Sequence, residues 1–406
     1  MSIAPPLAKG LSGSGATPTH GATDAASAHR HRITSIDTLR GLVMVIMLLD
    51  HVRETLYLHL QVTDPMTVPG TPPEVFFSRL ATHFCAPVFV FLTGLSAWLH
   101  ANPPASTPRP VMGFLLKRGL LLIALELTLV NFAWSGTYHV IYLQVMWAIG
   151  LCMAVLALMS GLPRAVLAAV GGVIVGGHNT LAGIVVAPES AWYLPWTLML
   201  HRGWALAEGA VRVRLTYPAL PWMGVILLGY AFAPVFSPRF NPQARRRVLA
   251  TTGLACLAAL LVLRGFNLYG ENQPWAHGET TVQTVMSWLN FTKYPPSLDF
   301  LLLTLGTGLL VLAALEVHDN RVTRVFSTFG GAPMFYYLLH LYMLLVGYKI
   351  LYAIFGPNQG TRFGVDADSF WIVWAVWLCM VPVLYVPVRA FARYKRQSTQ
   401  AWVRYF

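Results

Sequence analysis

Long apolar runs alternate with short stretches of charged residues, prolines and glycines along most of the chain. A helix needs roughly 20 mostly apolar residues to cross a bilayer. About ten segments have this length and composition, so the pattern predicts an all-α bundle of membrane-spanning helices. The approximate segments are 37–60, 80–100, 112–133, 139–160, 164–186, 217–236, 247–265, 298–317, 330–354 and 370–391.

Glycines interrupt one of these segments and widen the expected number of spans. Segment 164–186 contains Gly171, Gly172, Gly176 and Gly177. The sequence that follows it, WYLPWTLMLHRGW, fits an interfacial or re-entrant helix. We therefore expect about nine to eleven spans.

The composition supports a membrane protein. Of the 406 residues, 56% are hydrophobic and 11% are charged, and the mean hydropathy of +0.57 exceeds that of soluble domains. The formal net charge is +12, but the basic residues form short runs beside apolar stretches, so no nucleic-acid partner is expected. The four cysteines lie in apolar segments without a CxxC pattern, which indicates neither a disulfide framework nor a zinc site.

The distribution of basic residues predicts the orientation in the membrane. With the N-terminus inside, the inner connections carry more lysine and arginine than the outer loops, including an Arg-Arg-Arg run at 245–247. This asymmetry follows the positive-inside rule and places both termini in the cytoplasm. We expect a disordered tail over residues 1–31, one transmembrane domain over 32–392 and a basic cytoplasmic tail over 393–406.

The first apolar segment carries ionisable residues at helical spacing. Asp37, Arg40 and His51 share one helix face with two methionines. Arg40 and His51 are eleven residues apart, a rise of roughly 16 Å that prevents contact between them. They can instead bind the two ends of a long ligand such as acyl-CoA, with Asp37 and Arg40 at its phosphate end.

His51 is the candidate catalytic residue of this segment. An imidazole can remove a proton from an attacking hydroxyl or amine, and a neighbouring carboxylate can hold its tautomer. Glu54 lies one turn further on and faces the same way, while Asp50 is the less direct choice. Ionisable side chains inside spans are costly and usually mark a functional site. Alternatively, Asp50, Arg53 and Glu54 form a structural ion-pair cluster at the outer interface.

Other polar residues in apolar segments are candidates for a substrate pocket. His340 sits in the middle of a span, where it must find a polar partner, and we expect it in the pocket. His83, at the outer end of the second span, either faces His51 or packs as a hydrogen-bonded histidine. Glu126 and Asn131 are five residues apart and point in different directions on a helix, so we expect one of them to line the cavity.

Basic residues near the ends of spans allow two interpretations. Lys117 and Arg118, near the inner surface, either bind CoA phosphates or act as a topology signal. Lys293 and Asp299, at the start of a late span, are either substrate contacts or interface residues. The 13 histidines are scattered without an HExxH motif or a comparable cluster, so we expect no metal site.

Several stretches resemble membrane acyltransferases. IDTLRGLVMVIMLLDH resembles the first helix of the acyltransferase-3 family, whose Arg-x10-His motif Arg40 and His51 fit, and that of the heparan-alpha-glucosaminide N-acetyltransferase family. Similar to bacterial members of the second family are THFCAPVFVFLTGLSAWL, YPALPWMGVILLGYA, KYPPSLDFLLLTLG and GGAPMFYYLLHLYM. The resemblance covers nearly the whole chain after residue 31, and His340 resembles the late-span histidine of these families.

The resemblance implies a multi-pass enzyme of a cell membrane, as in a bacterial inner membrane. It implies transfer of an acyl group, expected to be acetyl, from cytosolic acyl-CoA to an amine or hydroxyl of a sugar or glycan on the far side. Acetyl-CoA or another acyl-CoA is then a co-substrate, and no permanently bound cofactor is expected. His51 would act as general base or acyl acceptor, with Asp50 and Glu54 as catalytic partners and Arg53 in the substrate pocket. The expected partners are the lipid bilayer, acyl-CoA and the acceptor, and a homo-oligomer is compatible with the sequence.

Two other functions fit some of the same residues. A transporter would use the intramembrane Asp, His, Arg and Glu side chains to bind a solute or relay protons, and it would show inverted repeats and paired broken helices. We find no internal repeat, and the charged residues gather on one helix. A membrane scaffold without chemistry would leave the cost of burying His51 and His340 unexplained.

Overall fold

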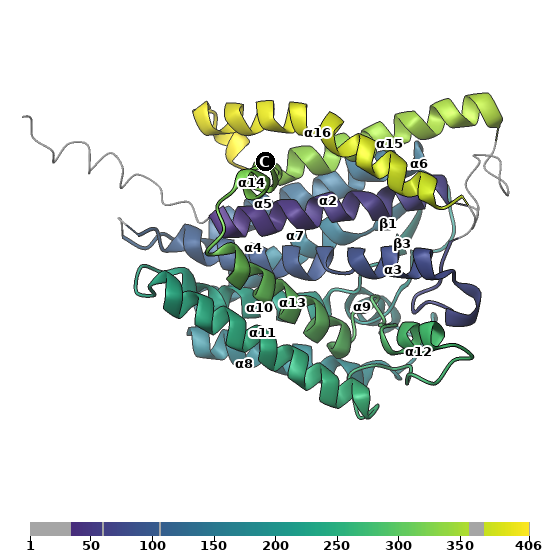
Figure 1. Cartoon of the computed structure of the whole chain (residues 1–406), viewed down its shortest axis with the longest axis horizontal. Coiled ribbons are helices and arrows are strands. Elements are labelled where there is room, and N and C mark those ends of the chain that lie inside the picture. The colour runs from purple at the N-terminus through teal and green to yellow at the C-terminus, as the bar shows by residue number, and fades with distance from the viewer. Residues whose placement is uncertain (1–33, 59–60, 105–106, 357–368, 406) are drawn as a thin grey trace, which may run out of the picture. The chain divides into compact units, whose positions relative to one another are not determined.

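The computed structural model describes residues 34–58, 61–104, 107–356 and 369–405, and these residues are mostly helical (Figure 1). The tail predicted over residues 1–31 lies outside the described residues. The helices up to residue 200 are α2 (Thr34–Leu56), α3 (Pro73–Thr82), α4 (Cys85–Ala101), α5 (Met112–Leu125), the π-helix η2 (Glu126–Val130), α6 (Asn131–Ser135), α7 (Val145–Met159), α8 (Arg164–Gly177) and α9 (Tyr193–Met199). The later helices are α10 (Leu220–Phe232), α11 (Pro242–Gly265), α12 (Thr281–Trp288), α13 (Leu298–Leu315), α14 (Arg321–Gly330), α15 (Pro333–Phe355) and α16 (Trp371–Gln397). Short 3-10 helices are η1 (Val68–Gly70), η3 (His178–Leu181), η4 (Ala233–Phe236) and η5 (Ala401–Tyr405).

The predicted spans all contain helical structure, but fewer helices meet the full requirement for crossing a membrane. Within the described residues, 5 helical segments are long and apolar enough: Pro73–Ala101, Pro242–Gly265, Leu298–Leu315, Pro333–Phe355 and Trp371–Gln397. Helix α2 is not among them, because its sequence includes several charged side chains. Membrane character is therefore supported, while the number of about ten spans and the cytoplasmic termini stay predictions.

A small sheet corrects the expectation of an all-α fold. Strands β1 (Val140–Leu143), β2 (Gly203–Leu206) and β3 (Arg212–Leu215) pair in the order β1-β3-β2. β1 runs parallel to β3, and β2 runs antiparallel to it. β1 lies at the start of the span predicted over 139–160, because a short apolar run such as VIYL has the same hydropathy in a strand and in a helix. A helix, α9, is present in the segment for which we expect an interfacial or re-entrant helix, and β2 follows it.

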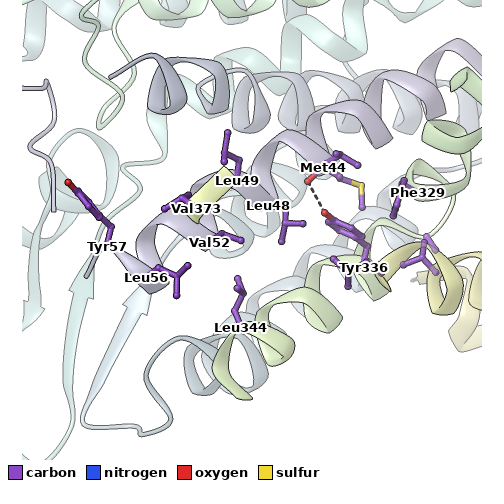
Figure 2. Close-up of a cluster of buried hydrophobic side chains, with 14 of the residues drawn as sticks. Met44, Leu48, Leu49, Val52, Leu56, Tyr57, Phe329, Tyr336, Leu344 and Val373 are labelled. Carbon is purple, nitrogen blue, oxygen red and sulfur yellow. Dashed lines mark hydrogen bonds between the residues drawn. The ribbon is translucent and has the colours of Figure 1, made fainter. Parts of the chain in front are cut away.

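Helix α2 lies among α3, α4, α13, α14, α15 and α16, which all pack against it (Figure 1). Figure 2 shows the apolar cluster that fills the space between α2 and its neighbours. The buried side chains labelled there include Met44, Leu48, Leu49, Val52 and Leu56 of α2, Phe329 of α14, Tyr336 and Leu344 of α15, and Val373 of α16. Within the cluster, the hydroxyl of Tyr336 donates a hydrogen bond of 3.1 Å to the carbonyl oxygen of Met44. This bond fixes α15 against α2 one turn before His340.

Glycines bring the backbones of packed helices into direct contact. At the crossing of α2 and α14, a methyl group added to Gly41 would overlap the carbonyl oxygen of Phe326. A methyl group added to Gly330 would likewise overlap the carbonyl oxygen of Asp37. Small residues allow membrane helices to approach this closely. Reciprocal glycines also occur at the crossings of α4 and α10 (Gly94, Gly229), α5 and α7 (Gly119, Gly150), α8 and α10 (Gly171, Gly224), and α11 and α13 (Gly253, Gly306).

The C-terminal boundary predicted at residues 392 and 393 falls inside a helix. α16 continues to Gln397 and is followed by η5. The ammonium group of Lys395, in the predicted basic tail, donates to the carbonyl oxygen of Gly331 at 3.4 Å. The start of the basic segment is therefore part of the helical bundle.

Gly41→Ala should destabilise the protein. The added methyl group has no space against α14, and overpacking of this kind costs about 1–3 kcal/mol. Thermal unfolding of the purified protein in detergent measures the effect. Gly172→Ala is the matched control, because Gly172 lies in the middle of α8 with open space around its Cα. Equal unfolding temperatures for the two variants would contradict the role of the glycine crossing.

Candidate functional site

The rings of His51 and His340 form a hydrogen-bonded pair between α2 and α15. Nδ1 of His51 lies 2.7 Å from Nε2 of His340, and the rings are stacked with centroids 5.0 Å apart. Nδ1 of His340 lies 2.8 Å from the carbonyl oxygen of Tyr336. His340 is 0% exposed, so the expectation that this mid-span histidine needs a polar partner is confirmed. The ring partner of His51 is this histidine and neither of the carboxylates, Asp50 and Glu54, that the sequence suggested.

Two aromatic side chains pack edge-on against His51. The ring centroid of Trp134 lies 4.9 Å away and that of Tyr337 lies 6.1 Å away. Trp134 belongs to α6, directly after the π-helix η2, whose wider turn changes the direction of the side chains that follow. Sequence reasoning missed Trp134, because a π-helix within the stretch ELTLVNFAW has no reliable pattern of its own.

Next to His51, Asp50 is the centre of a buried ion-pair cluster. Oδ1 of Asp50 accepts hydrogen bonds from Nε and Nη2 of Arg53 at 3.1 and 2.9 Å. Oδ2 accepts from Nη1 of Arg79, on α3, at 2.7 Å. Oε1 of Glu54 lies 3.4 Å from Arg53 and 3.5 Å from Arg79. The alternative interpretation of Asp50, Arg53 and Glu54 as an ion-pair cluster thus describes their contacts, and Arg79 is a fourth member of the cluster.

A polar cavity of about 300 Å³ adjoins this cluster. Its wall includes Arg53 and Glu54 of α2, Arg79 of α3 and Trp134 of α6, and the indole of Trp134 also contacts the ring of His51. One end of the small sheet supplies further polar side chains. Gln144 follows β1, Thr216 and Tyr217 follow β3, and Arg202 precedes β2.

Asp64 and the segment around Lys293 complete the cavity wall. The backbone N–H of Lys293 donates to Oδ1 of Asp64 at 3.3 Å. Burial raises the pKa of the Asp64 carboxyl above its ordinary value, although the positive charges of Arg79 and Lys293 oppose this. The guanidinium of Arg202 lies 4.8 Å above the ring of Tyr294, and the ammonium of Lys293 lies 5.3 Å from the same ring. Lys293 is buried beside the cavity, and its neighbour Tyr294 lines it.

Four other predicted residues are buried: His83, Glu126, Asn131 and Asp299. His83 packs against Phe300 with ring centroids 5.2 Å apart, and its ring nitrogens have no hydrogen-bond partner within the described residues. Oε2 of Glu126 accepts from the backbone N–H groups of Met146 and Trp147 at the start of α7, at 2.9 and 3.2 Å.

Asn131 joins η2 to the sheet. Its Nδ2 donates to the carbonyl oxygens of Glu126 and Tyr142, and its Oδ1 accepts from the backbone N–H of Tyr142. Glu126 and Asn131 therefore hold α7 and β1 in place. Asp299, at the start of α13, is also buried, and its backbone N–H donates to Gly270 at 3.1 Å.

A second polar centre lies at the other end of α2. Nη1 of Arg40 donates to Oδ1 of Asp37 at 2.8 Å, and Nη2 donates to Oγ of Ser96 on α4 at 3.0 Å. Arg118 of α5 lies within electrostatic range of Arg40 and has no polar partner within the described residues. Lys117, by contrast, is exposed.

Aromatic rings adjoin this second centre. The rings of His100 and Phe114 are stacked with centroids 4.2 Å apart. The ring of Tyr405, in η5, stacks on that of Phe114 with centroids 5.8 Å apart. His100 is also within electrostatic range of Arg109 and Arg118. Cationic and aromatic side chains are thus gathered at the Arg40 end of α2.

The face of α2 between the two centres is accessible only in places, because Met44, which lies on it between Arg40 and Met47, is 0% exposed. Arg40, Met47 and His51 are each partly exposed, although other helices surround α2. Val43 and Val52, on other faces, are buried. The described residues contain no group of three or more His, Cys, Asp or Glu side chains placed to hold a metal ion.

The chain matches a known protein family. The family described as "Heparan-alpha-glucosaminide N-acetyltransferase, catalytic" matches residues 32–274, which is more than half of the chain. The matched residues include His51, its ion-pair cluster and both ends of α2, whereas Lys293, Tyr294 and His340 lie beyond them. No curated protein matches the chain significantly.

Asp50→Asn should strongly destabilise the protein. The variant keeps the shape of the side chain but leaves the guanidinium groups of Arg53 and Arg79 without their shared negative charge. Breaking a buried ion pair from one side costs about 3–5 kcal/mol. Thermal unfolding in detergent measures the loss, with Asp319→Asn as the control, because the Asp319–Arg324 pair is largely exposed. A stable Asp50→Asn variant would show that the two arginines do not depend on this carboxylate.

Proposed function

The chain belongs to the heparan-alpha-glucosaminide N-acetyltransferase family, and from this premise we propose a specific reaction for it. The protein transfers an acyl group, in the simplest case acetyl, from cytosolic acyl-CoA to an amine or hydroxyl of a sugar on the far side of the membrane. His51 acts as general base or as acyl acceptor. The observation that carries the proposal is the position of His51 on α2, between a cationic centre at one end and a polar cavity at the other.

The Arg40 end is the proposed donor site. Guanidinium groups are suited to phosphate because they offer several N–H donors in one plane. Arg118 has no polar partner within the described residues and is held near Arg40 despite their like charge, which an incoming pyrophosphate would relieve. The stacked rings of His100, Phe114 and Tyr405 offer a surface against which a nucleotide base can pack.

The cavity at the outer end is the proposed acceptor site. Its volume of about 300 Å³ and its polar lining suit a sugar ring. Tyr217, Tyr294 and Trp134 provide both apolar surface and hydrogen-bonding groups, and Tyr294 donates to the hydroxyl of Tyr217 at 3.1 Å. Glu54, with its side chain 30% exposed, is placed to bind the hydroxyl or amine of the acceptor beside His51.

The reaction at His51 requires few steps. The acceptor oxygen or nitrogen attacks the thioester carbonyl carbon, its proton passes to the imidazole, the C–S bond breaks, and CoA leaves as the thiol after it takes up a proton. Alternatively, the imidazole attacks first, CoA leaves, and the acceptor then removes the acyl group from the ring. Asp50 supports either route indirectly, because it neutralises Arg53 and Arg79 near the ring.

His51→Ala should abolish acyl transfer and leave donor binding intact. Loss of a general base lowers a rate by about 10²–10⁴-fold, and loss of a covalent acceptor lowers it further. Release of CoA from acetyl-CoA, with a panel of amino sugars and neutral sugars as acceptors, gives the rate, and titration calorimetry in detergent gives the dissociation constant. His277→Ala, at an exposed position, is the control.

Two results would contradict the proposed reaction or the proposed role of His51. If the wild-type protein does not bind acetyl-CoA, the acyltransferase proposal fails, and solute transport through the same ionisable residues becomes the function to test. If His51→Ala transfers acetyl groups at the wild-type rate, the enzyme is supported but the role of His51 is wrong.

Arg118→Ala should weaken the binding of acetyl-CoA by about tenfold, because a charge-assisted hydrogen bond contributes about 1.5–3 kcal/mol. Lys117→Ala is the matched control, since the neighbouring lysine is exposed. Titration of both variants with acetyl-CoA measures the difference. Equal weakening by the two variants would indicate a diffuse electrostatic effect in place of a phosphate site.

A further inference from the structure

We propose that His340 is a positioning residue that makes Nε2 of His51 the reactive nitrogen and shares the positive charge that forms on His51 during the reaction. The inference rests on the proposed function and assigns a role to a residue outside the matched family region of 32–274. It follows from the order of donors and acceptors along one chain of hydrogen bonds, which begins at a backbone carbonyl group.

The backbone carbonyl of Tyr336 fixes the proton positions. A carbonyl oxygen can only accept, so Nδ1 of His340, at 2.8 Å, carries the proton. In a neutral imidazole the other nitrogen is then an acceptor, so Nε2 of His340 accepts from Nδ1–H of His51 at 2.7 Å. Nε2 of His51 is therefore left with its lone pair. The chain selects one tautomer for each ring.

The surroundings hold this chain in place. His340 is 0% exposed, which excludes exchange of its partners for bulk water. Its ring stacks on Tyr336 with centroids 5.1 Å apart, and Tyr336 is itself tied to α2 through Met44. Tyr337 packs edge-on against both histidine rings. The orientation of His51 is therefore determined by α15 as much as by its own helix.

His340 takes the place that a carboxylate has in many catalytic histidine pairs. Asp50 does not take it, because adjacent residues of a helix point about 100° apart and its oxygens bind Arg53 and Arg79. When Nε2 of His51 gains a proton or an acyl group, the ring becomes positively charged. The proton on Nδ1 can then move to Nε2 of His340, which becomes an imidazolium held by the Tyr336 carbonyl oxygen, and it returns when the proton or acyl group leaves Nε2. The positive charge is thus spread over two rings.

The test compares His340→Gln with His340→Leu. The amide oxygen of Gln can accept from Nδ1–H of His51, whereas Leu offers no acceptor. We expect His340→Leu to lower kcat by at least about 10²-fold, the effect of a misplaced proton in a catalytic pair, and the dissociation constant for acetyl-CoA to stay unchanged. His340→Gln should recover most of the rate. His178→Leu removes a buried histidine of η3 and controls for a general loss of stability.

Ring ¹⁵N NMR of the wild-type protein, with His51→Gln used to assign the signals, tests the tautomer without any need for turnover. We expect a proton on Nδ1 of His51 and a lone pair on Nε2. A proton on Nε2 would overturn the proposal, and so would equal loss of kcat in His340→Gln and His340→Leu. A wild-type protein that does not turn over acetyl-CoA would contradict the proposed function instead, and the NMR result would still decide which nitrogen His340 leaves free.

Discussion

The site depends on how Asp50 uses its two oxygens. One accepts from Arg53 and the other from Arg79, which links α2 to α3 inside the bundle. Burial of charge is tolerable only when the charge is paired and hydrogen-bonded. Consecutive residues of a helix point about 100° apart, so the Asp50 carboxylate meets the two guanidinium groups while the ring of the neighbouring His51 meets another helix. The ion-pair cluster and the histidine pair thus lie side by side on α2.

The packing of α2 sets the distance between the two polar centres. Gly41 places the backbone of α2 directly against α14, and Tyr336 ties it to α15. A helix fixed at both points cannot shift by a turn relative to its neighbours. Its rise then separates Arg40 and His51 by roughly 16 Å. Helix α2 therefore places the guanidinium of Arg40 against α4 and the imidazole of His51 against α15.

The small sheet explains why the cavity near His51 is polar. All three strands end or begin at the cavity, so β1, β2 and β3 bring Gln144, Arg202 and Tyr217 to one place although these residues are far apart in sequence. Trp134 lines this space and packs edge-on against His51. Side chains from separate segments thus form the cavity, and the ring of His51 next to Trp134 is hydrogen-bonded to His340 of α15.

The sequence by itself determined the helices, the membrane character, and His51 and His340 as polar residues needing partners, because hydropathy and the cost of buried charge act locally along the chain. It did not determine the sheet, the position of Trp134 after a π-helix, or Arg79 as the second partner of Asp50. Nor could it show that His51 pairs with His340, because a hydrogen bond between residues 289 positions apart depends on how α2 and α15 pack. The periodicity of the sequence gives the helix face on which a side chain lies, whereas only the tertiary structure decides which residues pack against that face.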